Sequence, residues 1–208
     1  MPITHTDVID VLQDPLVKRM NFRVGRVSLS AAEYGKVVDH LQTGDITVAP
    51  ARNGALYRPG PNTIELAGDS PLDVRVRRDI IHECTHALID INAPGTTRLE
   101  GEVAAYLAEF TYLLMWNNTR PFVGDRSQEM ANTPDSKRTL QSISQFAYTY
   151  NLHVPQGFGT SIDLRDIARM VTIVQAEPLY AGIGRNEKLI SPGVRIHPPW
   201  APAPHKAP

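Results

Sequence analysis

The sequence feature that most constrains the fold is a pair of helix patterns joined by a short turn. The first pattern spans residues 70–91 and opens with Ser70 as the expected N-cap, directly before a proline. The second spans residues 97–116 and opens at Thr97, which has a glutamate three positions later, as in a capping box. The turn at residues 92–95 contains Pro and Gly and is short, which favours antiparallel neighbours. The sequence therefore predicts a helical hairpin.

The first of these helices carries the motif His82-Glu83-Cys84-Thr85-His86. Residues four apart on an α-helix project from one face, so both imidazoles can reach a single metal ion. Glu83 lies about 100° around the helix from His82, which places it beside such an ion. A carboxylate in that position can take a proton from water. The motif predicts a metal site with His82 and His86 as ligands and Glu83 as general base.

A catalytic zinc site usually takes three protein ligands, so a third is expected on the second helix. Glu102 and Glu109 share one stripe of that helix, while Glu100 lies on the opposite side and caps the helix start. The stripe comprises Glu102, Tyr106, Glu109, Phe110 and Leu113. A carboxylate on an otherwise apolar face must be paired or ligated. We therefore expect Glu102 to be the third ligand; without a metal it would pair with Arg75 or Arg78.

The segments 80–88 and 99–106 resemble the gluzincins, which are zincin-type metallopeptidases. Members of this group bind zinc through the two His of H-E-x-x-H and a Glu on the following helix. The resemblance covers roughly residues 55–115. Its family patterns leave the third ligand open, because an E-G-x-A pattern selects Glu100 and an E-A-x-A-Y pattern selects Glu102.

The resemblance implies a zincin-like fold, Zn²⁺ as cofactor and a peptide or protein as substrate. In such folds an edge strand before the active helix pairs with the substrate, and residues 62–67 occupy that place here. The implied reaction is peptide-bond hydrolysis, with Glu83 moving the proton of a metal-activated water. A further donor to the developing oxyanion is expected, and Tyr148, Tyr150 and His153 are candidates by residue type alone.

Two other carboxylates near the motif have alternative roles. Asp90 lies four residues after His86, so it could orient that imidazole, or it could be solvated near the helix end. Glu109 has the same two alternatives. Both residues are therefore candidates for a supporting role rather than for metal ligation.

The rest of the chain predicts one α+β domain over residues 1–190, followed by a Pro-rich extended tail at 191–208. We expect a small, mostly antiparallel sheet, the active-site helix pair and a helical C-terminal portion. Further helices are expected at 6–20 (broken at Pro15), 30–43, 137–152 and 162–177, and a loop at 117–136. Strands are expected at 46–49, 55–58 and 63–67, with Asn53-Gly54 as a hairpin turn between the first two.

Composition excludes several classes of partner. Lys plus Arg number 21 against 22 for Asp plus Glu, so no basic excess favours nucleic acid. No apolar run approaches the roughly 20 residues of a membrane span, so no membrane partner is expected either. A single cysteine, Cys84, excludes an internal disulfide and a Cys-based zinc cluster. With no Sec-type signal visible, we expect a cytoplasmic protein, although signal-independent export would leave the same sequence. Composition does not specify the oligomeric state.

Two alternative functions use the same residues. One is a non-catalytic metal-binding or scaffold protein with a vestigial zincin site, which would lack an open coordination position within reach of Glu83. The other is a toxin or effector protease delivered to a target cell, which a neighbouring immunity gene would support.

Overall fold

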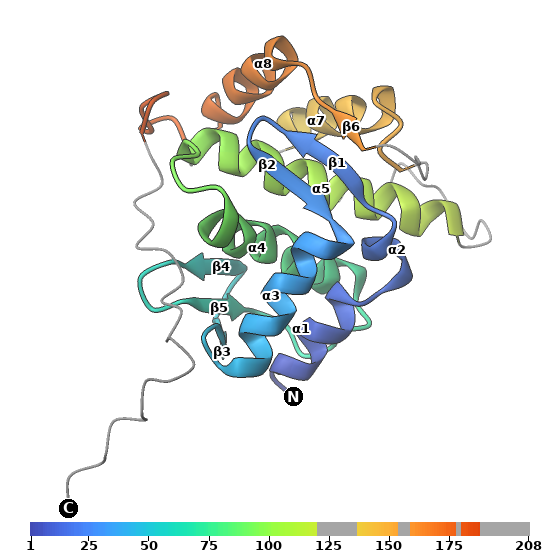
Figure 1. The fold of residues 1–208 in the computed structure, drawn as a ribbon, viewed down its shortest axis with the longest axis vertical. Helices are drawn as coiled ribbons and strands as arrows, with labels where there is room; N and C mark the ends of the chain where they lie inside the picture. Colours follow the sequence, from blue (N-terminus) through green and yellow to red (C-terminus); the bar gives the residue numbers. More distant parts are fainter. Residues whose placement is uncertain (120–136, 154–158, 178–179, 188–208) are drawn as a thin grey trace, which may run out of the picture.

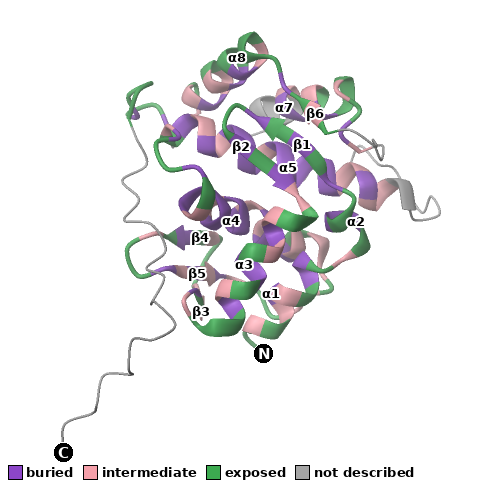
Figure 2. Cartoon of the chain, in the orientation of Figure 1, coloured by how far each residue is buried: buried purple, intermediate pink, exposed green. Residues whose placement is uncertain are grey.

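The fold is built around two long antiparallel helices, as the sequence predicts. In the computed structural model, helix α4 (Val74–Asn92) and helix α5 (Arg98–Thr119) lie side by side at the centre of the molecule (Figure 1). Both helices are largely buried along their facing sides (Figure 2). The structure describes residues 1–119, 137–153, 159–177 and 180–187. The predicted tail at 191–208 and most of the predicted loop at 117–136 lie outside these residues.

The helix starts agree with the sequence at α5 and differ at α4. Thr97 and Glu100 form the expected capping box, in which each residue accepts the other's main-chain N–H. Helix α4 begins three residues later than expected, because Asp73 rather than Ser70 is its N-cap and accepts the N–H of Arg75. Ser70 instead starts the preceding turn, and its carbonyl accepts the N–H of Asp73.

In the described part of the chain, five further helices surround this hairpin, and their positions follow the predicted patterns. The predicted helix break at Pro15 is confirmed: proline lacks an N–H, and Pro15 is the first residue of a new short helix. Gly44 ends the third helix in the left-handed conformation, with φ of 80°. These helices are α1 (His5–Leu12), α2 (Pro15–Lys18), α3 (Ala31–Thr43), α7 (Lys137–Thr149) and α8 (Leu164–Gln175).

The sheet beside α4 has an order that the sequence did not predict. Strands β3 (Thr47–Pro50), β4 (Ala55–Arg58) and β5 (Thr63–Leu66) are arranged in the order β3-β5-β4. Because β3 and β4 lie on opposite edges, the predicted hairpin at Asn53-Gly54 is wrong. The antiparallel hairpin joins β4 to β5 instead, while β3 pairs with β5 in parallel. The predicted edge strand at 62–67 is therefore central, and β4 is the edge strand that faces α4.

A second three-stranded sheet was missed. Strands β1 (Asn21–Val24) and β2 (Val27–Ser30) form a hairpin across Gly25-Arg26, and β6 (Thr160–Ser161) pairs with β1 in parallel. The alternation of polar and apolar residues along β1 (NFRV) and β2 (VSLS) is the sequence signal that could have identified them. In place of the expected single, mostly antiparallel sheet, the described residues form two sheets, each with one parallel and one antiparallel pair.

One apolar core connects the elements and extends from Ile3 to Ile183. Within the described part of the chain, no helix combines the length and the apolar character needed to cross a membrane.

Arg77 ties the start of α4 to its neighbours, and its removal should destabilise the fold. Its guanidinium pairs with Asp14, the N-cap residue of α2, donates to the hydroxyl of Tyr112 and lies over the ring of Trp116. We expect Arg77→Ala to lower the free energy of unfolding by about 3 kcal/mol, because it leaves a largely buried carboxylate unpaired. The exposed Arg75→Ala should lower it by no more than about 0.5 kcal/mol. Urea denaturation measures both; equal losses would contradict a special role for Arg77.

Candidate metal centre

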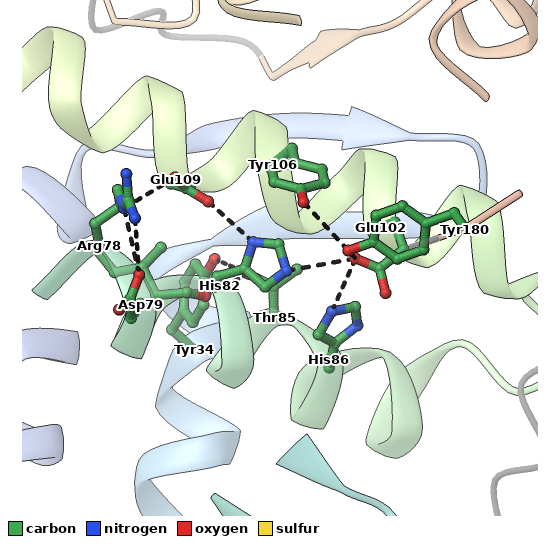
Figure 3. Close-up of polar contacts among 11 residues, drawn as sticks. Tyr34, Arg78, Asp79, His82, Thr85, His86, Glu102, Tyr106, Glu109 and Tyr180 are labelled. Carbon is green, nitrogen blue, oxygen red and sulfur yellow. Dashed lines mark hydrogen bonds and ion pairs between the residues drawn. The ribbon is translucent and has the colours of Figure 1, made fainter. Parts of the chain in front are cut away.

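Two histidines of α4 and one glutamate of α5 meet between the two helices (Figure 3). One ligand atom from each of His82, His86 and Glu102 lies within 4.8 Å of the others. Nε2 of His82 is 3.5 Å from Oε2 of Glu102, and Nε2 of His86 is 3.7 Å from the same oxygen. The structure thus brings together the three residues that the sequence predicts as ligands.

The spacing and chemistry of these groups fit a divalent metal. Tetrahedral zinc binds nitrogen and oxygen ligands at about 2.0–2.2 Å, which places neighbouring ligand atoms about 3.4 Å apart. The two distances to Glu102 are close to that value. Two imidazoles and one carboxylate suit zinc, and other first-row divalent ions can use the same donors. The residues present therefore fit a three-ligand metal site.

The geometry separates Glu102 from its alternatives. Glu100 is engaged with Thr97 at the start of α5 and is not part of the group of three. The predicted metal-free partners of Glu102 lie elsewhere, since Arg75 pairs with Asp73 and Arg78 pairs with Asp79 and Glu109.

Glu109 supports His82 from the side away from Glu102. Its Oε2 lies 3.0 Å from Nδ1 of His82, and its Oε1 lies 3.0 Å from Nε of Arg78 (Figure 3). The carboxylate is buried, with 4% of the residue exposed. A carboxylate at Nδ1 holds the proton there and directs the lone pair of Nε2 toward a metal. The supporting role expected of Glu109 therefore has a geometric basis, and the solvated alternative is wrong.

The electrostatics of the centre favour a positive charge between the helices. Burial by itself lowers the pKa of His82, but hydrogen bonds with Glu102 and Glu109 raise this pKa well above its ordinary value. Burial would raise the pKa of Glu102, but the charge of His86 and the hydrogen bonds with both histidines hold this pKa well below its usual range. Carboxylates that stabilise an imidazolium would equally stabilise a bound cation.

A change at Glu109 should weaken metal binding without removing a ligand. We expect Glu109→Gln to lower the affinity for zinc about 10- to 100-fold, because the amide is a weaker acceptor for the Nδ1 proton of His82. Competition with a chromogenic chelator measures the affinity. Glu65→Gln on β5, which removes an exposed ion pair with Arg58, is the matched control and should leave the affinity unchanged. An affinity equal in the two variants would show that Glu109 does not support the site.

Tyr180 lies at the centre although nothing in the sequence indicated it. Its hydroxyl donates to Oε2 of Glu102 at 3.0 Å and lies 3.2 Å from the hydroxyl of Tyr106 (Figure 3). Burial and the charge of Glu102 raise the pKa of Tyr180 far above its usual value, so the hydroxyl stays protonated and acts as a donor. The residue is 78 positions from Glu102 and belongs to no periodic pattern, so only the tertiary fold reveals it.

The oxyanion donors proposed from the sequence have other partners. Tyr150 donates to Asp166 at 2.7 Å, and the exposed ring of Tyr148 stacks on His153 with centroids 5.4 Å apart. The hydrogen bonds and ring contact that the structure gives these three side chains are with Asp166, with the main chain of Asp163 and with one another.

The general-base candidate and Asp90 both contact strand β4. Oε2 of Glu83 accepts the main-chain N–H of Tyr57 at 2.7 Å, and Glu83 is buried. Asp90 is also buried, with 6% exposed, so its solvated alternative is wrong. Its Oδ2 accepts a hydrogen bond from the hydroxyl of Tyr57 at 2.9 Å.

Comparisons with protein-family models, with curated proteins and with solved structures give no match. We therefore base the function on the metal centre itself.

Proposed function

We propose that this protein is a zinc-dependent peptidase with a zincin-like arrangement. The observation that carries the proposal is the group of His82, His86 and Glu102, with Glu83 between the two histidines on the same helix. Among the described residues three protein ligands form this group, and a three-ligand set would keep a coordination position for water or substrate. The helix pair beside a small sheet with an edge strand facing α4 supports the same arrangement.

The chain supplies a base and a donor for the reaction. His82, His86 and Glu102 would hold a Zn²⁺ ion, which would lower the pKa of a water molecule toward ~7 and polarise the carbonyl of the scissile bond. Glu83 accepts a proton as the oxygen of this water attacks the carbonyl carbon, and gives it to the amine nitrogen when the C–N bond breaks. Tyr180 is the candidate donor to the oxygen on which negative charge develops, and its single hydroxyl proton would turn from Glu102 to that oxygen.

Strand β4 is the candidate binding strand for an extended peptide. The N–H of Tyr57 points to Glu83 and therefore away from β5, so this edge of β4 faces the centre. Main-chain groups of alternate residues share that direction, which adds Ala55 to the same edge. A peptide aligned there would pair with the main-chain groups of Ala55, because Glu83 already occupies the N–H of Tyr57. The candidate substrate-binding strand is therefore residues 55–58 and not the predicted residues 62–67, because β5 already pairs with a strand on each side.

The proposal is tested with a mixture of peptides of diverse sequence. Zinc-loaded protein and chelator-treated protein are incubated with the same mixture, and new peptide termini are identified by mass spectrometry. We expect cleavage only with the loaded protein and its return when zinc is added back. Zinc binding without any cleavage would overturn the peptidase proposal and favour the non-catalytic metal-binding alternative.

A further inference from the structure

Tyr57 ties the edge strand β4 to helix α4 at two points. Its main-chain N–H donates to Oε2 of Glu83 at 2.7 Å, and its side-chain hydroxyl donates to Oδ2 of Asp90 at 2.9 Å. Glu83 and Asp90 are seven residues apart on α4, or about 10 Å along the helix axis. The ring of Tyr57 therefore runs beside two turns of the helix, and all three residues are buried.

The main-chain contact constrains the carboxylate of Glu83. The N–H of Tyr57 occupies one oxygen, Oε2, which restricts the side chain to rotamers that keep this bond. The structure gives the other oxygen, Oε1, no partner among the described residues, so it is available for the proton of a reacting water. The position of the Tyr57 N–H along α4 thus determines where Oε1 lies.

The hydrogen bond from the Tyr57 hydroxyl to Asp90 determines where the Tyr57 N–H lies along α4. Among the strands that the structure describes, β4 pairs with β5 alone, and its other edge is attached to α4 through Tyr57. The Tyr57 hydroxyl also lies 3.4 Å from Oδ1 of Asn62, but its single proton goes to the closer and charged acceptor, Asp90. Burial and the charge of Asp90 raise the pKa of Tyr57, which keeps the hydroxyl protonated as a donor.

We infer that Asp90 is a positioning residue for Glu83, and that Tyr57 transmits its effect from one turn of α4 to another through the edge strand. The inference rests on the proposed function, in which Glu83 is the general base. Asp90 touches neither substrate nor metal in this role. Through Tyr57 it holds β4 at one position along the axis of α4. That position determines the orientation of the Glu83 carboxylate.

Three substitutions test separately the contacts through which Asp90 and Tyr57 position Glu83. Tyr57→Phe keeps the N–H and the ring but removes the hydroxyl, Asp90→Leu removes the acceptor, and Asp90→Asn keeps an acceptor oxygen. In metal-free protein we expect Tyr57→Phe and Asp90→Leu to make the amide of residue 57 exchange about 10-fold faster, measured by NMR. In zinc-loaded protein both should lower kcat about 10- to 100-fold with little change in KM, because a small displacement of a catalytic group has that effect. Asp90→Asn should stay close to wild type in both measurements.

A matched control distinguishes positioning from a general loss of stability. The Tyr34 hydroxyl is also buried and also contacts α4, where it lies 2.7 Å from Oγ1 of Thr85. Tyr34→Phe removes a comparable hydrogen bond from the opposite side of the helix. We expect it to lower stability about as much as Tyr57→Phe but to leave amide exchange at residue 57 and kcat unchanged. The double variant Tyr57→Phe/Asp90→Leu should have a kcat no lower than either single variant, since the two residues act as one unit.

Equal losses of kcat in Tyr34→Phe and Tyr57→Phe would overturn the inference, as would wild-type amide exchange in both Tyr57→Phe and Asp90→Leu. The exchange measurement needs neither metal nor substrate. If wild-type protein cleaves no peptide, the proposed function fails, while the exchange rates still decide whether Asp90 holds β4 at Glu83.

Discussion

Purified wild-type protein is expected to bind about one zinc ion per chain, and Glu102→Ala is expected to lose nearly all of it. The carboxylate of Glu102 lies 3.5 and 3.7 Å from the Nε2 atoms of His82 and His86, as a shared metal requires. Without it, two imidazoles four residues apart remain, which is a much weaker site. Elemental analysis after dialysis against a weak chelator measures the zinc content.

Glu100→Ala is the matched control for this experiment. Glu100 lies two residues from Glu102 but engages Thr97 at the helix start, so its removal should cost helix stability and leave the zinc content unchanged. Added zinc should also stabilise the wild-type fold by about 2.7 kcal/mol at a free concentration a hundredfold above Kd, and should stabilise Glu102→Ala far less. Wild-type protein that holds no zinc after reloading would refute the metal centre.

Glu83→Gln is expected to reduce peptide cleavage by about 10²- to 10⁴-fold while zinc remains bound. The amide is isosteric with the carboxylate, and its oxygen can still accept the N–H of Tyr57, so the local structure should be kept. It cannot take up a proton from water near neutral pH. The rate of cleavage of one peptide from the mixture, measured together with the zinc content, gives the result.

The control for this variant is again a glutamate outside the centre. Glu65→Gln on the exposed side of β5 should cleave at the wild-type rate. Loss of cleavage together with loss of zinc in Glu83→Gln would show a damaged site rather than a missing base. Cleavage by Glu83→Gln at the wild-type rate would exclude Glu83 as the general base.

Much of the candidate site could be predicted because its parts lie on helices. The spacing of His82 and His86 puts both imidazoles on one face of α4, and the stripe that contains Glu102 and Glu109 faces them from α5. These relations depend on the 3.6-residue period and on one short turn. The short turn between α4 and α5 makes the two helices antiparallel neighbours. The face of α4 with the two histidines therefore packs against the face of α5 with the two glutamates.

The sequence by itself determined the helices, the faces that they bury and the three residues that meet between α4 and α5. Only the tertiary structure decided the strand order β3-β5-β4, the second sheet and the partners of Tyr57 and Tyr180. The physical reason is the range of the interactions. A helix satisfies its hydrogen bonds within four residues, so its pattern is local, whereas strand pairing and a contact such as Tyr180 with Glu102 depend on how the whole chain packs.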